Sequence, residues 1–213
     1  MRTTVTAHPL RSLSALALAA AVLAGCASNK AQESTTYDFG PAARQAAAAA
    51  APAIPALVVM DATGPAALES ERMVYRLNYA DALQARTYAN SRWASQPLQM
   101  VTQRFRTRLS QSGMKVLTAT DASTGVPLLR VEVDDFVHAF SGVSQSEGQL
   151  TLRASLFNEH RLVDQRTFSR STPAASADAP GGARALAAST DAVAADILAW
   201  LQTVDTRADT RKR

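Results

Sequence analysis

The segment that most constrains the fold is residues 128–140, a run of 13 residues that is long enough to be a central strand. Apolar and polar residues alternate along its first half, which indicates a β-strand with one buried face. The pattern changes near Asp134 and Asp135, and aromatic residues follow. We therefore expect a β-bulge at that point, or burial of both faces beyond it. The face expected to be buried carries Leu129, Val131, Val133, Val137 and Ala139.

A second alternating segment follows and turns back on itself. Its apolar positions are Leu150, Leu152, Ala154 and Leu156. Asn158-Glu159-His160 then makes a tight turn into residues 162–168, which predicts an antiparallel hairpin. Shorter strands are predicted at residues 57–60, 72–77 and 114–118, and a strand combined with an irregular loop at 85–93.

Two segments show helical periodicity. Pro97 opens the first, apolar residues recur at three or four positions up to Leu109, and Gly113 suits a left-handed C-cap. The second runs from about Arg184 to Gln202. The order strands, helix, strands, helix predicts an α+β fold with two helices packed on a mostly antiparallel sheet in a single domain.

The only cysteine, Cys26, ends the sequence Leu-Ala-Gly-Cys, so the chain can form neither an internal disulfide nor a thiolate metal site. Arg2, Arg11 and an apolar run from Leu13 to Leu23 precede it. A charged start, a short apolar stretch and small residues before the cut are typical of an export signal over residues 1–25. The run is shorter than the about 20 residues of a membrane span.

Leu-Ala-Gly-Cys resembles the bacterial lipobox, which implies an N-acyl diacylglyceryl lipid on Cys26 and no other cofactor. Two or more acyl chains hold a protein stably on a bilayer. By resemblance to lipoprotein sorting, an aspartate after the cysteine favours retention in the inner membrane. Ala27 and Ser28 stand there instead, so we expect anchoring in the outer membrane, facing the periplasm. A plain secretory signal with an incidental cysteine is the alternative.

Composition divides the rest of the chain into three parts. Residues 26–56 form the lipidated N-terminus and an Ala/Pro-rich tether, 57–204 the folded domain, and 205–213 a disordered charged tail. Loss of two arginines with the signal lowers the net charge from +4 to about +2, and most of that excess lies in the tail. No basic stripe with interleaved aromatic residues is present, which disfavours nucleic-acid binding.

Several blocks resemble the ABC-type transport auxiliary lipoprotein family, the group that contains paraquat-inducible protein C. They are Gly64 to Leu68, Met73 to Leu77, Tyr88 to Ala94 before Pro97, Leu129 to Phe136, Arg166 to Phe168 and Ile197 to Leu201. Their order behind a lipobox is the specific feature, and the resemblance covers roughly Tyr37 to Leu201. The long Ala/Pro stretch after Tyr37 departs from the family pattern.

The resemblance implies a non-catalytic subunit of a trans-envelope transport system. Family members accompany ABC transporters and MCE-domain proteins that move lipids across the periplasm. The chain is thus expected to be an outer-membrane docking subunit with an MCE-domain protein and ABC transporter components as partners, and a homo-oligomer is left open. A structural outer-membrane assembly lipoprotein, or a peptidoglycan-associated one, is the alternative.

Four residues are candidates for a partner interface. Arg92 and Trp93 combine two residue types that are enriched in interface hot spots, although a Trp just before a helix also suits the core. Arg104 and Arg108, with Arg106, give the first helix a cationic surface that suits an acidic partner or an ordinary solvated face.

A hydrolase site could be drawn from Asp134, Asp135 and His138. On a regular strand, residues 134 and 138 share a face and 135 points away, so only one carboxylate and one imidazole would converge. That set falls short of the usual metal-ligand count. We expect no catalytic and no metal-binding residues, and Cys26 is consumed as the anchor.

Overall fold

The structure is a computed structural model that describes residues 34–43, 52–121 and 124–204. The described residues form one compact unit. The predictions for Cys26, for the export signal over 1–25 and for the tail over 205–213 fall outside the described residues. Among the described residues, no helix combines the length and apolar character needed to span a membrane.

Three long strands make up the larger part of the sheet. They are β6 (Leu128–Phe140), β7 (Ser146–Asn158) and β8 (Arg161–Pro173), and each pairs antiparallel with the next. Glu159 and His160 have φ values of 48° and 66°, as a two-residue turn between β7 and β8 requires. The predicted central strand and hairpin are confirmed.

The other edge of β6 is shared by two short parallel partners. β2 (Ala56–Val59) pairs with its beginning and β3 (Arg72–Leu77) with its end. β5 (Lys115–Leu117) extends the sheet beyond β2, whereas β4 (Asp81–Trp93) and β1 (Thr35–Tyr37) extend it beyond β3. The long pairings are antiparallel, so the predicted α+β class with a mostly antiparallel sheet holds, while the parallel pairing of the short strands was not predicted.

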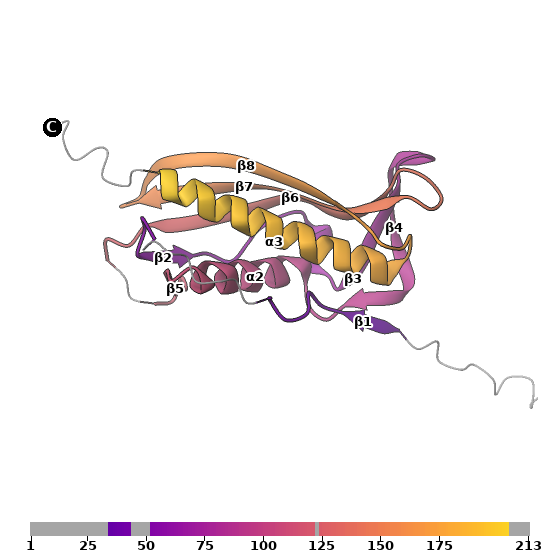
Figure 1. Cartoon of the computed structure of the whole chain (residues 1–213), viewed down its shortest axis with the longest axis horizontal. Helices are drawn as coiled ribbons and strands as arrows, with labels where there is room; N and C mark the ends of the chain where they lie inside the picture. The colour runs from indigo at the N-terminus through magenta and orange to yellow at the C-terminus, as the bar shows by residue number, and fades with distance from the viewer. Residues whose placement is uncertain (1–33, 44–51, 122–123, 205–213) are drawn as a thin grey trace, which may run out of the picture. The chain divides into compact units, whose positions relative to one another are not determined.

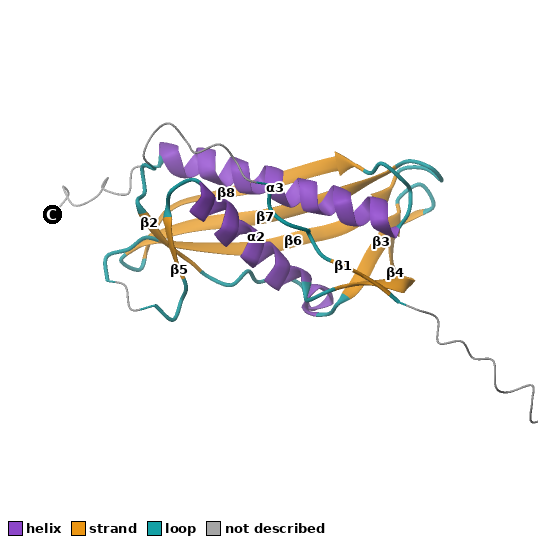
Figure 2. Cartoon of the chain, turned by 60° about the horizontal axis from the view of Figure 1, so that its bottom comes forward, coloured by secondary structure: helices purple, strands orange, loops and turns teal. Residues whose placement is uncertain are grey.

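Two helices cover one face of this sheet (Figures 1 and 2). A short 3₁₀ helix, Ala66–Glu69, precedes them in the chain, between β2 and β3. α2 (Pro97–Gln111) ends before Gly113, whose φ of 88° confirms the predicted left-handed position. α3 (Ala179–Thr203) begins five residues earlier than expected. Asp178 accounts for the difference, because its carboxylate accepts a hydrogen bond from Gly181 N at 2.8 Å and caps the helix.

The core lies between the helices and the sheet. Its largest fully buried side chains are Trp93, Trp200, Phe105, Leu57, Met73, Leu109, Leu129, Leu150, Leu152, Leu156, Leu186 and Ile197. Glycine at two positions allows the close approach of α3 to the sheet. A Cβ at Gly148 would lie 2.4 Å from Leu186 N, and one at Gly182 would lie 2.3 Å from His138 Nδ1.

The predicted bulge in β6 is confirmed by a shift in its register with β7 between Val133 and Asp135. The extra residue reverses the alternation, so Phe136 and His138 face the helices together with Val133. The structure thus corrects the expected faces: Asp134 is exposed, whereas His138 is fully buried.

Two further predictions need correction. Residues 85–93 belong to one strand, β4, in place of a strand and an irregular loop. Within the predicted tether over 26–56, residues 35–37 form β1, which pairs in parallel with residues 91–93 of β4, and Ile54 is buried in the core. The two corrections have different causes: β1 pairs with residues 56 positions away, whereas β4 pairs mainly with β3, the strand directly before it.

Candidate functional site

The four predicted interface residues surround residues 36–43, the described segment nearest to Cys26. Arg92 Nε donates to Thr36 Oγ1 at 3.4 Å. The Trp93 ring lies 5.9 Å from the ring of Phe39. Arg104 donates to the carbonyls of Phe39 and Gly40, and Arg108 Nη1 donates to Ala43 O at 2.6 Å. We call these four side chains, with the segment that they hold, the N-terminal clamp.

Burial decides what the clamp residues can contact. Trp93 is 1% exposed, and Arg104 and Arg108 are each 5% exposed. The expected cationic surface of α2 is therefore wrong for these two arginines, because α3 and residues 39–43 cover them. Of the four predicted residues only Arg92 remains at the surface, where it forms an ion pair of 3.9 Å with Glu71.

Asp191 of α3 supplies the counter-charge inside the clamp. Its carboxylate accepts hydrogen bonds from Arg108 Nε at 2.8 Å and from Arg108 Nη2, and lies 3.6 Å from Arg104 Nε. Those hydrogen bonds raise the pKa of the Arg108 guanidinium above its ordinary value. The Arg104 guanidinium also lies 5.6 Å above the Phe39 ring, a cation–π distance. The clamp thus joins α2, α3 and the N-terminal segment.

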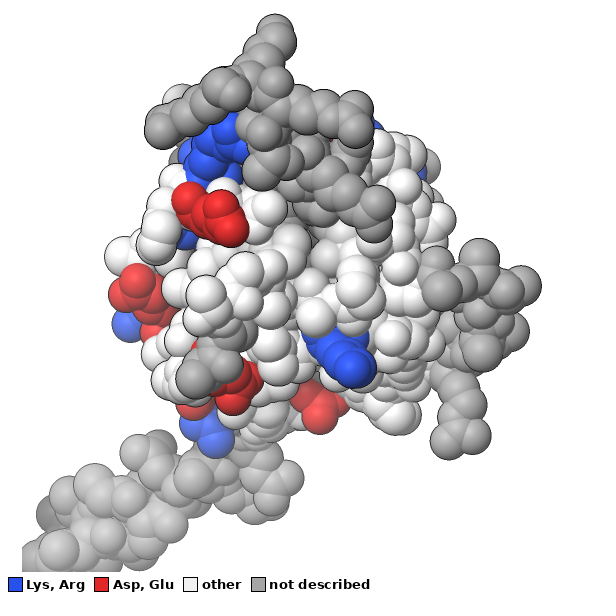
Figure 3. Space-filling model, turned by 90° about the vertical axis from the view of Figure 1, so that its left-hand side faces the viewer, with Lys and Arg blue, Asp and Glu red and all other residues white. Residues whose placement is uncertain are grey.

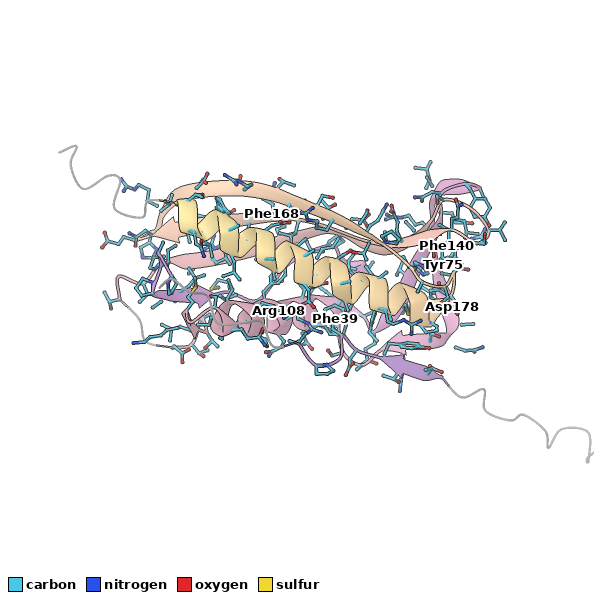
Figure 4. The ribbon with its side chains drawn as sticks, in the orientation of Figure 1. Phe39, Tyr75, Arg108, Phe140, Phe168 and Asp178 are labelled. Carbon is cyan, nitrogen blue, oxygen red and sulfur yellow. The ribbon has the colours of Figure 1, made fainter. Side chains whose placement is uncertain are left out.

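A second buried polar group lies at the end of the domain where α3 begins, near Tyr75, Phe140 and Asp178 (Figure 4). The Tyr88 hydroxyl and His138 Nδ1 are 2.8 Å apart, and the His138 ring packs 4.4 Å from Phe140. Burial lowers the pKa of His138 to about 4 and raises the pKa of Tyr88. Both groups are therefore neutral near pH 7 and hold strands β4 and β6 together.

The residues considered for hydrolysis do not converge. His138 is buried against α3, Asp134 faces solvent, and both carboxylate oxygens of Asp135 accept from Arg76 Nη1, at 3.1 and 3.0 Å. Within the described ranges, no group of three His, Cys, Asp or Glu side chains is placed to hold a metal ion.

The uncovered face of the sheet carries an open hollow of about 720 Å³ between the segment 60–63 and strands β6 to β8. Each of its charges has a partner: Arg153 pairs with Glu132, Asp61 pairs with Arg106, and Arg130 lies 4.8 Å above the Phe157 ring. The hollow therefore offers a polar surface whose charged groups already have partners.

The sequence analysis missed two sets of residues. Asp191 was overlooked because an acid on a helix normally faces solvent. Tyr79, Leu83 and Val143 are large apolar side chains exposed in or beside turns. Their signal was present, since Val143 stands in Ser-Gly-Val-Ser and Leu83 lies two residues after Asp81, and these small and polar residue types are common in turns.

Comparisons with known proteins agree with this architecture. A family model described as the ABC-type transport auxiliary lipoprotein component matches residues 37–198. The crystal structure of protein XCC0632 from Xanthomonas campestris is 22% identical and superposes with a TM-score of 0.67 over 79% of this chain and 95% of that one. The crystal structure of an uncharacterized protein is 18% identical, with a TM-score of 0.64 over 79% and 99%. No curated protein matches the chain.

Proposed function

Because this chain belongs to the ABC-type transport auxiliary lipoprotein family, we propose that it is a lipid-anchored, non-catalytic docking subunit of an MCE-type ABC transport system that moves lipids between membranes. Its anchor would be the acylated Cys26 in the outer membrane, with the domain in the periplasm. The observation that carries the proposal is the family match over 37–198, which covers most of the folded domain.

The clamp supports a positional role. It fixes residues 36–43 to the domain, so a lipid on Cys26 would hold the domain a short distance from the bilayer. Confinement at a surface raises the effective concentration of a domain for a partner that arrives from across the periplasm. The chemistry of the buried groups supports the same role, because Tyr88, His138, Arg104 and Arg108 are engaged in contacts that hold the fold together.

Co-purification tests the proposal directly. The full-length acylated chain, solubilised in mild detergent after crosslinking in cells, should retain an MCE-domain protein and ABC transporter subunits. A matched sample in which the chain carries Arg92→Ala tests whether the exposed clamp residue contributes to that contact. Retention of peptidoglycan or of assembly proteins, without transport subunits, would favour the structural lipoprotein instead.

Membrane fractionation tests the location. We expect the wild-type chain in the outer-membrane fraction. Ala27→Asp should shift it to the inner-membrane fraction, whereas Ala27→Asn, which has nearly the same size and no charge, provides the control. An inner-membrane location of the wild-type chain would contradict the proposed outer-membrane anchor. It would not bear on the transport role, which the co-purification tests.

A further inference from the structure

Three of the four exposed large hydrophobic residues in the described part of the chain lie at one end of the domain. Leu83 is 95% exposed, Val143 82% and Tyr79 48%, whereas Leu162, at 49%, lies at the opposite end in the β7–β8 hairpin. Leu77 and Phe140, the last residues of β3 and β6, are register partners, so the turns that follow these strands are neighbours (Figure 1). We call Tyr79, Leu83 and Val143 the apolar end.

The two turn segments that carry the apolar end contain a single charged side chain, and Arg86 of β4 donates to Gln84 at the edge of the first. Among residues 78–84 and 141–145, Asp81 is the only charged side chain. Its carboxylate accepts a hydrogen bond from Leu83 N at 2.9 Å, so it also orders the turn. The opposite end differs, because Lys, Arg, Asp and Glu side chains are interspersed over it (Figure 3). Exposed apolar side chains on turn segments with so little charge suit the boundary between headgroups and acyl chains.

The chain outside the described residues limits where this end can lie. Eight peptide steps separate Cys26 from Ser34, which precedes β1. Whatever its conformation, such a segment spans at most about 28 Å. Figures 1 and 2 place β1 at the same end of the domain as the turns after β3 and β6. The N-terminal clamp prevents residues 36–43 from lengthening this connection.

We propose that the apolar end docks on the surface of the bilayer that holds the acylated Cys26. The inference rests on the proposed function through that lipid anchor. The short connection brings this end to the membrane, and Leu83, Val143 and Tyr79 enter the boundary between headgroups and acyl chains. The opposite end, with the β7–β8 turn, is then presented to the periplasm, which gives the docking subunit a fixed orientation.

Site-specific fluorescence tests this contact on the full-length acylated chain in phospholipid vesicles. Leu83→Cys and Val143→Cys each introduce a thiol for an environment-sensitive dye, and Leu162→Cys is the matched control from the opposite end. A nitroxide-labelled phospholipid should quench the dye at positions 83 and 143 at least about twofold more than at 162, because interfacial segments enter roughly 5–10 Å into the bilayer. Iodide in the buffer should quench most strongly at 162.

Equal lipid quenching at all three positions would overturn the proposal. Protection from both quenchers at 83 and 143 would also overturn it, in favour of a second copy of the chain or another protein on this end. The wild-type chain should take up no dye, because its only thiol is acylated. Labelling of Cys26 would show that this thiol carries no lipid, which would contradict both the anchor and the inference. Loss of transport subunits in the co-purification, with lipid quenching intact, would contradict the docking role alone.

Discussion

Charged side chains normally lie at the surface and large apolar ones in the core, and the N-terminal clamp and the apolar end each depart from one half of this rule. The clamp buries two guanidinium groups, whereas the apolar end leaves a leucine and a valine in solvent. A buried cation is tolerated only where several acceptors are fixed around it. In the clamp those acceptors are the carboxylate of Asp191 and three carbonyls of residues 39–43. The comparison shows that buried ion pairs hold the N-terminal segment on the domain, whereas the apolar side chains at the same end remain exposed to solvent.

Removal of the clamp's carboxylate should have the largest effect. Asp191→Ala leaves Arg104 and Arg108 buried without their counter-charge. Breaking a buried ion pair by removing one partner costs about 3–5 kcal/mol, so the free energy of unfolding should fall by about that amount. Urea denaturation followed by circular dichroism measures it.

Asp196→Ala is the matched control on the same helix. Asp196 pairs with Arg170, whose side chain is 50% exposed, and exposed pairs contribute less than about 1 kcal/mol. A similar loss of stability in both variants would contradict the view that burial makes the clamp charges important.

Acid should destabilise the domain through the buried imidazole of His138. Burial lowers the pKa of His138 to about 4 in the folded chain, from about 6.5 when unfolded. Between these values the unfolded chain binds a proton that the folded chain does not. The stabilisation is therefore complete above pH 6.5 and is lost as the pH falls to about 4, by up to about 3 kcal/mol. The arginines of the clamp stay charged throughout.

Denaturation at several pH values, compared between wild type and His138→Gln, measures this contribution. The variant removes the titrating imidazole and keeps a polar side chain near the Tyr88 hydroxyl, so its stability should depend less on pH in this window. His160→Gln, in the β7–β8 turn, should leave the wild-type dependence in place. The same slope in all three proteins would contradict the assignment to His138.

What the sequence predicted, and what it did not, follows from the range of the interactions. Strands β6 to β8, both helices and the bulge at Asp134 were predicted because alternation, helical periodicity and turn residues are local signals. The Asp178 cap was also readable, since an Asp shortly before Pro180 is a helix-start signal. It was missed because the small residues around it resemble a loop.

The clamp could not be predicted because its contacts are long-range. Arg104 donates to two carbonyls that precede it by 65 and 64 positions in the sequence, and Arg108 donates to Asp191, which follows it by 83 positions. α2 shows a solvated face in its own sequence, but α3 and residues 39–43 cover that face. A three-residue strand such as β1 has too few residues for any periodicity, so its pairing with residues 91–93 of β4 cannot be predicted from its own sequence.

Filling the space at the start of α3 should have an intermediate effect. A Cβ at Gly182 would lie 2.3 Å from His138 Nδ1, so Gly182→Ala must displace the ring and its bond to Tyr88. Overpacking costs about 1–3 kcal/mol, against roughly 0.5–1 kcal/mol gained from alanine in a helix. The melting temperature should fall. Gly142→Ala, whose nearest neighbour would lie 3.7 Å away, should leave it unchanged. Equal melting temperatures of the two variants would contradict the view that α3 packs tightly against His138 at Gly182.

The smallest change in global stability, and the sharpest link between the two regions, is expected from Phe39→Ala. The Phe39 ring is only half-buried, 5.9 Å from Trp93 and 6.0 Å from Phe136, and its loss should open residues 35–43 locally. Local opening made easier by about 1.4 kcal/mol speeds hydrogen exchange of the β1 amides about tenfold, while the amides of β7 keep their protection. Release of this segment lengthens the connection from Cys26, so lipid quenching of a dye at position 83 should also decrease. Faster exchange of β1 without any change in quenching would mean that the apolar end finds the membrane by itself, and that the clamp serves only the fold.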